Sequence, residues 1–160
     1  MKLLKSHLAL ASMITFAMSL HGQDLELPSP SPYFSAIIVS DLDTSLIWYQ
    51  QMLGFEVADT TGLPARGIRQ GNLRLDGAAL ELIEIAGALT PGQALEGKDA
   101  RFITGLFKVG FAVSSFDDWI QYLKVKGATF RGDVVEDPVT GKRMAIVLDP
   151  DGNRVQLFEE

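Results

Sequence analysis

A turn near the C-terminus has the spacing of a calcium-binding loop. Oxygen-bearing side chains stand at positions one, three, five and twelve of such a loop, as Asp149, Asp151, Asn153 and Glu160. The calcium loop also needs a glycine at position six and a helix on either side, and this chain has Arg154 at position six. Pro150 and Gly152 suit a plain turn. The sequence therefore predicts a turn between two strands here and no calcium site.

Other residue types exclude further kinds of catalysis. The chain has no cysteine, and its two histidines, His7 and His21, both lie in the N-terminal segment described next. A nucleophile activated by histidine is therefore not available to the rest of the chain. The glycine-rich stretch after residue 86 lacks the Gly-Lys-Ser/Thr ending of a phosphate-binding loop.

Residues 1–22 have the layout of a secretory signal peptide. Lys2 and Lys5 precede an uncharged apolar run of 13 residues, Leu8 to Leu20, which is too short to span a membrane. A retained anchor helix is the alternative interpretation. Residues 23–32 hold three prolines at alternate positions, which favours an extended tether. We therefore expect a periplasmic or secreted protein with no membrane contact after processing.

The remaining chain, residues 33–160, is long enough for one domain with an adequate core. It is acidic, because removal of Lys2 and Lys5 takes the formal charge from −6 to −8. A negative domain repels phosphate backbones, so nucleic acid is not an expected partner.

Part of this domain is repeated 74 residues later, so that residues 35–54 correspond to residues 109–127. Each copy runs from an apolar strand through a turn rich in Ser and Asp into an amphipathic helix that stops at a glycine. In the first half three strands follow the helix, and the second half repeats the order. The repeat predicts an α+β fold of two βαβββ modules, residues 33–86 and 106–160, joined by a connection at 87–105.

The expected strands cover residues 33–39, 55–59, 66–75 and 78–85, then 106–113, a strand from 129, 144–148 and 154–159. Asp41 should cap the first helix and Gly54 should end it. The second helix should run from about Phe116 to Lys126. Ser115, just before this helix, and Asp118, in its first turn, have the spacing of a capping box.

Four short motifs accompany the repeat: Val39-Ser-Asp-Leu-Asp43, Leu53-Gly-Phe-Glu-Val57, Leu80-Glu-Leu-Ile-Glu84 and Asp149-Pro-Asp-Gly-Asn153. With the repeat, they resemble the vicinal oxygen chelate superfamily, which includes glyoxalase I, bleomycin-resistance proteins and extradiol dioxygenases. The resemblance spans residues 33–160. It implies the fold and a cavity between the two halves, but no single reaction, because this scaffold serves many chemistries.

In metal-using members, the resemblance implies four metal ligands, on the first and last strands of each half. The corresponding residues here are Phe34, Glu81, Lys108 and Gln156. Only Glu81 is an ordinary ligand, because Phe34 has no donor atom and Lys108 is a cation near neutral pH. Gln156 offers one carbonyl oxygen, which with Glu81 does not complete a site. We therefore expect neither a family-type metal centre nor a cofactor.

If these positions converge, the Lys108 ammonium replaces the metal and faces Glu81. The two residues then form a structural ion pair, or Lys108 anchors an anionic or carbonyl-bearing ligand. A third interpretation puts one strand out of register. Strand alternation adds Arg154 and Phe158 to the face that carries Gln156, which gives six candidate ligand-binding residues in all.

The sequence thus favours an exported protein that binds a small organic molecule in a largely apolar cavity. One alternative is a lyase or isomerase of glyoxalase type, with Glu81 as the base and Lys108 stabilising an enolate. Another is a degenerate domain that serves only in assembly. The sequence leaves a homodimer open.

Overall fold

The computed structural model describes residues 32–99 and 105–160, so the expected signal peptide and nearly all of the expected tether lie outside the described residues. Residues 32–160 form one compact unit. No helix among the described residues is long and apolar enough to cross a membrane.

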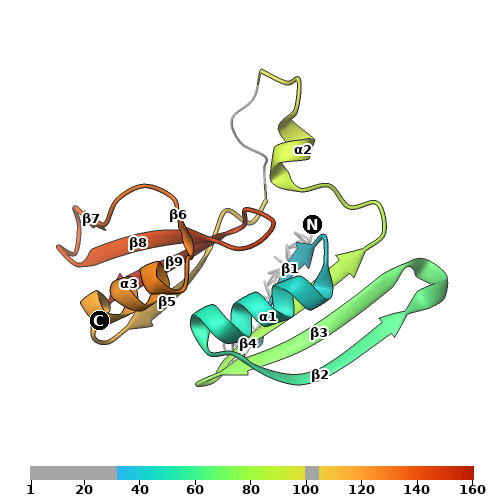
Figure 1. Ribbon diagram of the computed structural model, residues 1–160, viewed down its shortest axis with the longest axis horizontal. Coiled ribbons are helices and arrows are strands. Elements are labelled where there is room, and N and C mark those ends of the chain that lie inside the picture. The colour runs from blue at the N-terminus through green and yellow to red at the C-terminus, as the bar shows by residue number, and fades with distance from the viewer. Residues whose placement is uncertain (1–31, 100–104) are drawn as a thin grey trace, which may run out of the picture. The chain divides into compact units, whose positions relative to one another are not determined.

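The first half is one helix and a four-stranded sheet. Its order along the chain is β1 (Ser35–Val39), α1 (Leu42–Leu53), β2 (Glu56–Leu63), the 3₁₀ turn η1 (Pro64–Arg66), β3 (Ile68–Leu75) and β4 (Ala78–Ile85). The strands lie in the order β1-β4-β3-β2, with β1 parallel to β4 and the other pairs antiparallel (Figure 1).

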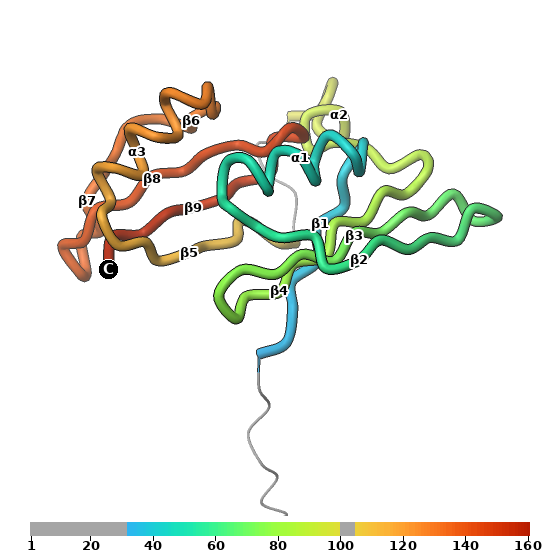
Figure 2. The backbone as a smooth tube through the Cα atoms, turned by 60° about the horizontal axis from the view of Figure 1, so that its bottom comes forward, coloured from blue at the N-terminus to red at the C-terminus, as the bar shows by residue number. Residues whose placement is uncertain are grey.

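The second half repeats this arrangement. It comprises β5 (Val109–Val113), α3 (Phe116–Val125), β6 (Thr129–Phe130), β7 (Val135–Glu136), β8 (Arg143–Leu148) and β9 (Arg154–Glu159). The sheet order is β5-β9-β8-β6, with β7 also paired to β8 (Figure 2). The strand expected from residue 129 is therefore two short pieces, separated by a segment in which Gly132 has a φ of 84°.

The registers of the two sheets confirm the repeat. Ala36 lies opposite Glu81 in the parallel pair β1/β4, and Gly110 lies opposite Gln156 in the parallel pair β5/β9. The α+β architecture of two βαβββ modules is confirmed. Strand β5 begins at Val109 and not at Leu106, so Lys108 stands just before its strand, as Phe34 stands just before β1.

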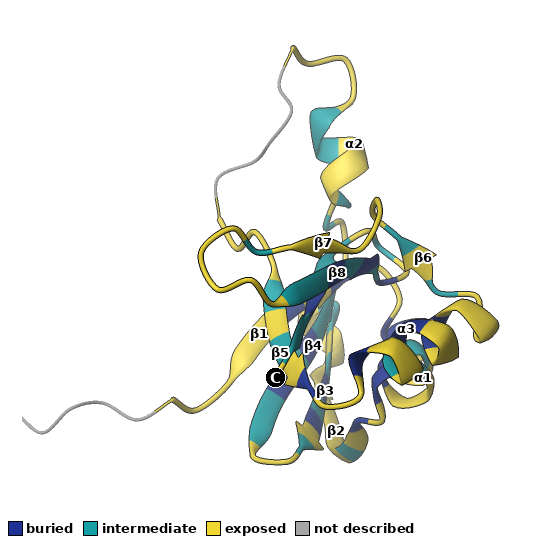
Figure 3. Cartoon of the chain, turned by 90° about the vertical axis from the view of Figure 1, so that its left-hand side faces the viewer, coloured by how far each residue is buried: buried dark blue, intermediate teal, exposed yellow. Residues whose placement is uncertain are grey.

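Helix α1 is built as its sequence predicts. The Asp41 carboxylate accepts a hydrogen bond from the Thr44 N–H at 2.7 Å, and Gly54 ends the helix in the left-handed conformation with a φ of 78°. The helix packs closely on β3 at Gly71, where an added Cβ would lie 2.8 Å from a Leu46 methyl. Helix α1, and likewise the helix of residues 116–125 in the second half, turns a buried side towards the core and an exposed side outward (Figure 3).

The capping box expected at the start of α3 is wrong. Ser115 has a left-handed backbone, with φ 53° and ψ 51°, and its side chain makes no cap hydrogen bond. A capping hydroxyl needs an extended backbone to reach the third helical N–H. Arg143 stabilises this end of the helix instead, through ion pairs with Asp117 and Glu159 at 2.7 Å each.

The connection between the halves contains a short helix that the sequence pattern did not predict, α2 (Pro91–Leu95). Thr90 and Gln93 form a full capping box at its start, and Pro91 occupies the first turn. This helix matters for the site because Pro91 and Leu95 contribute to the wall of a cavity.

Candidate functional site

Strand alternation places the candidate residues as expected. On β4, Leu80 and Leu82 are buried in the core, while Glu81 lies on the opposite face and is partly exposed. On β9, Val155 and Leu157 are buried, with Arg154, Gln156 and Phe158 on the other face. The face opposite the core leucines and valines therefore carries Glu81 on β4 and the buried Gln156 on β9, while Phe34 and Lys108 stand just before β1 and β5.

The donors at those four positions do not suit a metal ion. Phe34 is 50% exposed and carries no donor atom, and Lys108 is a cation. The buried Gln156 amide donates to the Met144 Sδ at 2.7 Å, and its Oε1 has no hydrogen-bond partner. Only Glu81 supplies a carboxylate. Within residues 32–99 and 105–160, no group of three or more His, Cys, Asp or Glu side chains could hold a metal ion.

Glu81 and Lys108 do not meet in an ion pair. Among the described residues, the ion pairs shorter than 4.0 Å are made by two arginines. Arg69 pairs with Asp43 and Glu84, and Arg143 pairs with Asp117 and Glu159. Glu81 lies between Ala36 and Asn72 of the neighbouring strands of the first sheet. The Lys108 ammonium lies 5.9 Å from the centroid of the Phe107 ring. The structural ion pair that the sequence offered as one interpretation is therefore not formed between these two residues.

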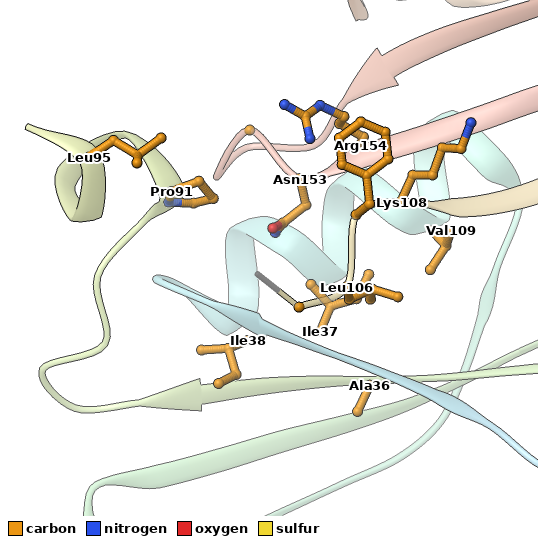
Figure 4. Close-up of a pocket in the computed structure, with 13 residues that line it drawn as sticks. Ala36, Ile37, Ile38, Pro91, Leu95, Leu106, Lys108, Val109, Asn153 and Arg154 are labelled. Carbon is orange, nitrogen blue, oxygen red and sulfur yellow. The ribbon is translucent and has the colours of Figure 1, made fainter. Parts of the chain in front are cut away.

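A cavity of about 350 Å³ lies where β1, α2, the segment before β5 and the β8–β9 turn come together. Its apolar wall includes Ala36, Ile38, Pro91, Leu95 and Leu106, and its polar residues are Lys108, Asn153 and Arg154 (Figure 4). We call this cavity the Arg154 pocket. It holds two of the six candidate residues, Lys108 and Arg154.

A second cavity, of about 480 Å³, adjoins the segment before β5 from another side. Its wall includes Phe34, Phe55, Ala79 and Phe111. Of the described residues that line this cavity, Lys108 alone is charged. Lys108 thus borders both cavities. Glu81, Gln156 and Phe158 line neither of them, as far as the described residues extend.

The cations of the Arg154 pocket are arranged around one aromatic ring. The Arg154 guanidinium lies 4.4 Å from the centroid of Phe107, whose ring also contacts Lys108. Burial lowers the pKa of Arg154, and the nearby positive charge of Arg131 lowers it further. The charged side chains described in the wall of the pocket are therefore both cations, although the protein as a whole is negative.

The turn before Arg154 is held by a buried carboxylate. Asp149 accepts hydrogen bonds from the N–H groups of Asp151 and Asn153 on one oxygen, and from Tyr49 and the Asn153 amide on the other. Both oxygens are thus used within the protein, which accords with the expected plain turn in place of a calcium loop. Burial raises the pKa of Asp149.

Several residues of the Arg154 pocket were not found by sequence reasoning. The sequence predicts Leu106 and Phe107 at the start of a strand over 106–113, and Pro91 and Leu95 within the connection 87–105, whereas the structure has α2 there and begins β5 at Val109. The Thr90-Pro91 sequence with Gln93 is a helix-start signal that could have revealed α2. No pattern in the sequence pairs Phe107 with Arg154, because their contact joins distant parts of the chain.

Two βαβββ modules with a cavity against the first strand of each define a vicinal oxygen chelate domain. The model of the Glyoxalase/Bleomycin resistance protein/Dioxygenase superfamily matches residues 33–157, and the chain belongs to that superfamily.

Proteins of known sequence and structure agree with this assignment. The chain is 34% identical to YwkD of Bacillus subtilis (strain 168) over 125 residues, covering 78% of this chain and 93% of YwkD. It is 31% identical over 128 residues to YaeR of Escherichia coli (strain K12), covering 78% of this chain and 92% of YaeR.

Among solved structures, a glyoxalase family protein from Enterococcus faecalis superposes with a TM-score of 0.71 at 25% identity, covering 81% of this chain and 97% of that one. The Leishmania major glyoxalase I has a TM-score of 0.61 at 21% identity, covering 82% of this chain and 88% of that one, and this likeness concerns the fold alone.

Proposed function

We propose that this protein is an exported member of the superfamily that binds a small organic molecule in the Arg154 pocket, without a metal centre of the family type. The observation that carries the proposal is the pocket itself. Its volume of about 350 Å³ suits a small molecule, and its wall combines apolar side chains with a few polar groups at one end.

The proposal of metal-free binding rests on the chemistry of the side chains. A phenyl ring, an ammonium and an amide stand at three of the four positions that supply ligands in metal-using relatives, and the amide is bonded to Met144. A divalent ion gains little from such a set, since only Glu81 brings negative charge.

Binding is tested by thermal shift with the full chain and three probes of equal length: hexanoate, hexanamide and hexylamine. At least one probe should raise the melting temperature of the wild type and leave that of Ile38→Trp unchanged, because the indole fills the pocket. Val139→Trp, at a residue 90% exposed and outside the pocket wall, is the matched control and should bind like the wild type. Failure of all three probes would contradict the proposal.

Metal independence is tested on the same samples. Probe binding should be unchanged by EDTA, and native mass spectrometry after incubation with Zn²⁺ or Ni²⁺ should show no stoichiometric ion. Tight binding of one metal per chain would refute this part of the proposal.

Export is tested separately. After expression in a Gram-negative host, the protein recovered by osmotic shock should begin near residue 20 to 23, because the signal peptide is expected to end between Ser19 and Gly22. An intact Met1 on membrane-bound material would contradict export.

A further inference from the structure

The charge of the Arg154 pocket is opposite to that of the protein. Thirteen of the residues that the structure describes line it, and the charged ones among these are Lys108 and Arg154. No acidic side chain lies among these thirteen, although the chain carries 20 acidic and 14 basic residues. A third cation, Arg131, is near enough to affect Arg154. An apolar cavity with cations at one side suits a ligand with an apolar body and one negative group.

Arg154 is held in position by the elements around it. It is the first residue of β9 and directly follows the turn that Asp149 fixes through the Asn153 N–H at 2.8 Å. The Ser40 N–H donates to Asp151 of the same turn at 2.9 Å, which ties the turn to the first module. On its other side the guanidinium lies over the Phe107 ring at 4.4 Å. A guanidinium positioned in advance loses little freedom when it binds a ligand.

Lys108 has a different part in the pocket. Figure 4 shows Lys108 and Arg154 on one side of the pocket, across from Ala36 and Ile38, with the ammonium extending away from the guanidinium. Lys108 therefore adds a positive charge and the methylene groups of its side chain to the wall. Arg154 is the group placed to form directed hydrogen bonds with a ligand.

The electrostatics agree with this geometry. Burial and the nearby positive charge of Arg131 both lower the pKa of Arg154. A negative group in the pocket would be attracted by the positive charges of Arg154, Lys108 and Arg131 together.

We propose that the Arg154 pocket selects small organic carboxylates, with the carboxylate on the Arg154 guanidinium and an apolar body against Ile38, Leu95 and Leu106. This inference rests on the proposed function and adds the chemical class of its ligand. A carboxylate matches the guanidinium fork in a bidentate manner. The apolar wall favours it over a phosphate, whose second charge would be costly to remove from water.

The test measures dissociation constants by isothermal titration calorimetry for the full chain with hexanoate, hexanamide and hexylamine. Hexanoate should bind at least about tenfold more tightly than hexanamide, which has the same shape without the charge. Hexylamine should bind more weakly than both, because like charges repel. The preference for hexanoate should shrink with rising salt, since screening acts within about 8 Å at physiological ionic strength.

Variants assign the preference to Arg154. In Arg154→Met the dissociation constant of hexanoate should rise about tenfold or more, while that of hexanamide should stay within about threefold of the wild type. Arg66→Met removes the same charge from an exposed residue outside the pocket wall and should leave both dissociation constants unchanged. Far-ultraviolet circular dichroism of each variant confirms that the fold is kept. If Arg154→Met does not fold, Arg154→Lys gives the second measurement: it keeps the charge and loses the fork, and should weaken hexanoate alone.

The outcomes separate the two proposals. Equal binding of hexanoate and hexanamide would overturn the selection of carboxylates and leave the proposed function intact. Inorganic phosphate that binds more tightly than hexanoate would also overturn it, because the apolar body would then contribute nothing. If none of the three organic probes binds, both proposals fail together.

Discussion

The Tyr49 hydroxyl of α1 donates a hydrogen bond to the Asp149 carboxylate of the β8–β9 turn at 3.2 Å, and both residues are buried. Tyr49 belongs to the first module and Asp149 to the second, so this bond joins the two halves through the core. Burial and the negative charge of Asp149 raise the pKa of Tyr49, which keeps the hydroxyl protonated and able to donate. The same carboxylate positions the turn that leads into Arg154.

We expect Tyr49→Phe to lower the free energy of unfolding by about 1–2 kcal/mol, because the buried Asp149 oxygen loses one of its donors. Tyr33→Phe is the matched control, at a residue 77% exposed, and should change stability by less than about 0.5 kcal/mol. Urea denaturation followed by circular dichroism measures both. Equal effects of the two substitutions would show that the buried bond contributes nothing.

We expect stability to fall with acid partly through Glu159. Arg143 donates to this carboxylate and lowers its pKa from 4.5 to about 2, so the folded state holds the ionised form more strongly than the unfolded chain. The contribution is therefore present above pH 4.5 and lost as the pH falls towards 2. Between these values Glu159→Gln should show a shallower decline in stability than the wild type.

Glu136→Gln, on the exposed strand β7, removes the same charge and should keep the decline of the wild type. Denaturation midpoints recorded at intervals between pH 2 and pH 6 measure the slopes. If the stability of Glu159→Gln falls with pH as steeply as that of the wild type, the acid sensitivity does not come from the contact between Arg143 and Glu159.

We expect Glu81 and Lys108 to act independently on stability. Since the two side chains form no ion pair in the chain, Glu81→Gln and Lys108→Met should combine additively to within about 0.5 kcal/mol. A double-mutant cycle from urea denaturation measures the coupling. A larger coupling would mean that the charges interact after all, as they would if Lys108 occupied the place of a metal opposite Glu81.

We expect the first module to be unable to fold as a monomer. In the whole chain the Phe55 ring packs on Phe111 of the second module at 5.6 Å, and Tyr122 donates to the Gln51 carbonyl. Residues 33–86 expressed alone lose these contacts and leave apolar surface in water. The fragment should aggregate or form a dimer, which gel filtration with light scattering detects. A folded monomer of this fragment would contradict the prediction.

The sequence by itself determined the repeat, the order of the strands and helices, and which side of each strand is buried. These properties follow from local periodicity, and the two copies 74 residues apart reinforce one another. The structure pairs Glu81 with Ala36 and Gln156 with Gly110, which are equivalent positions of the two modules. The motifs also sufficed for the family, because the turns and helix ends they encode are local.

The tertiary structure alone decided what Lys108 and Arg154 lie against. The sequence indicated that both face away from the core, but the partner of a long side chain depends on where other segments come to rest. Phe107, just before β5, lies against both cations, and α2 brings Leu95 to the same cavity. The contact of Phe107 with Arg154 and the approach of α2 join residues far apart in the chain and have no periodic signature. The sequence therefore offered Glu81 as one partner for Lys108, whereas the structure places Lys108 in the wall that carries Arg154.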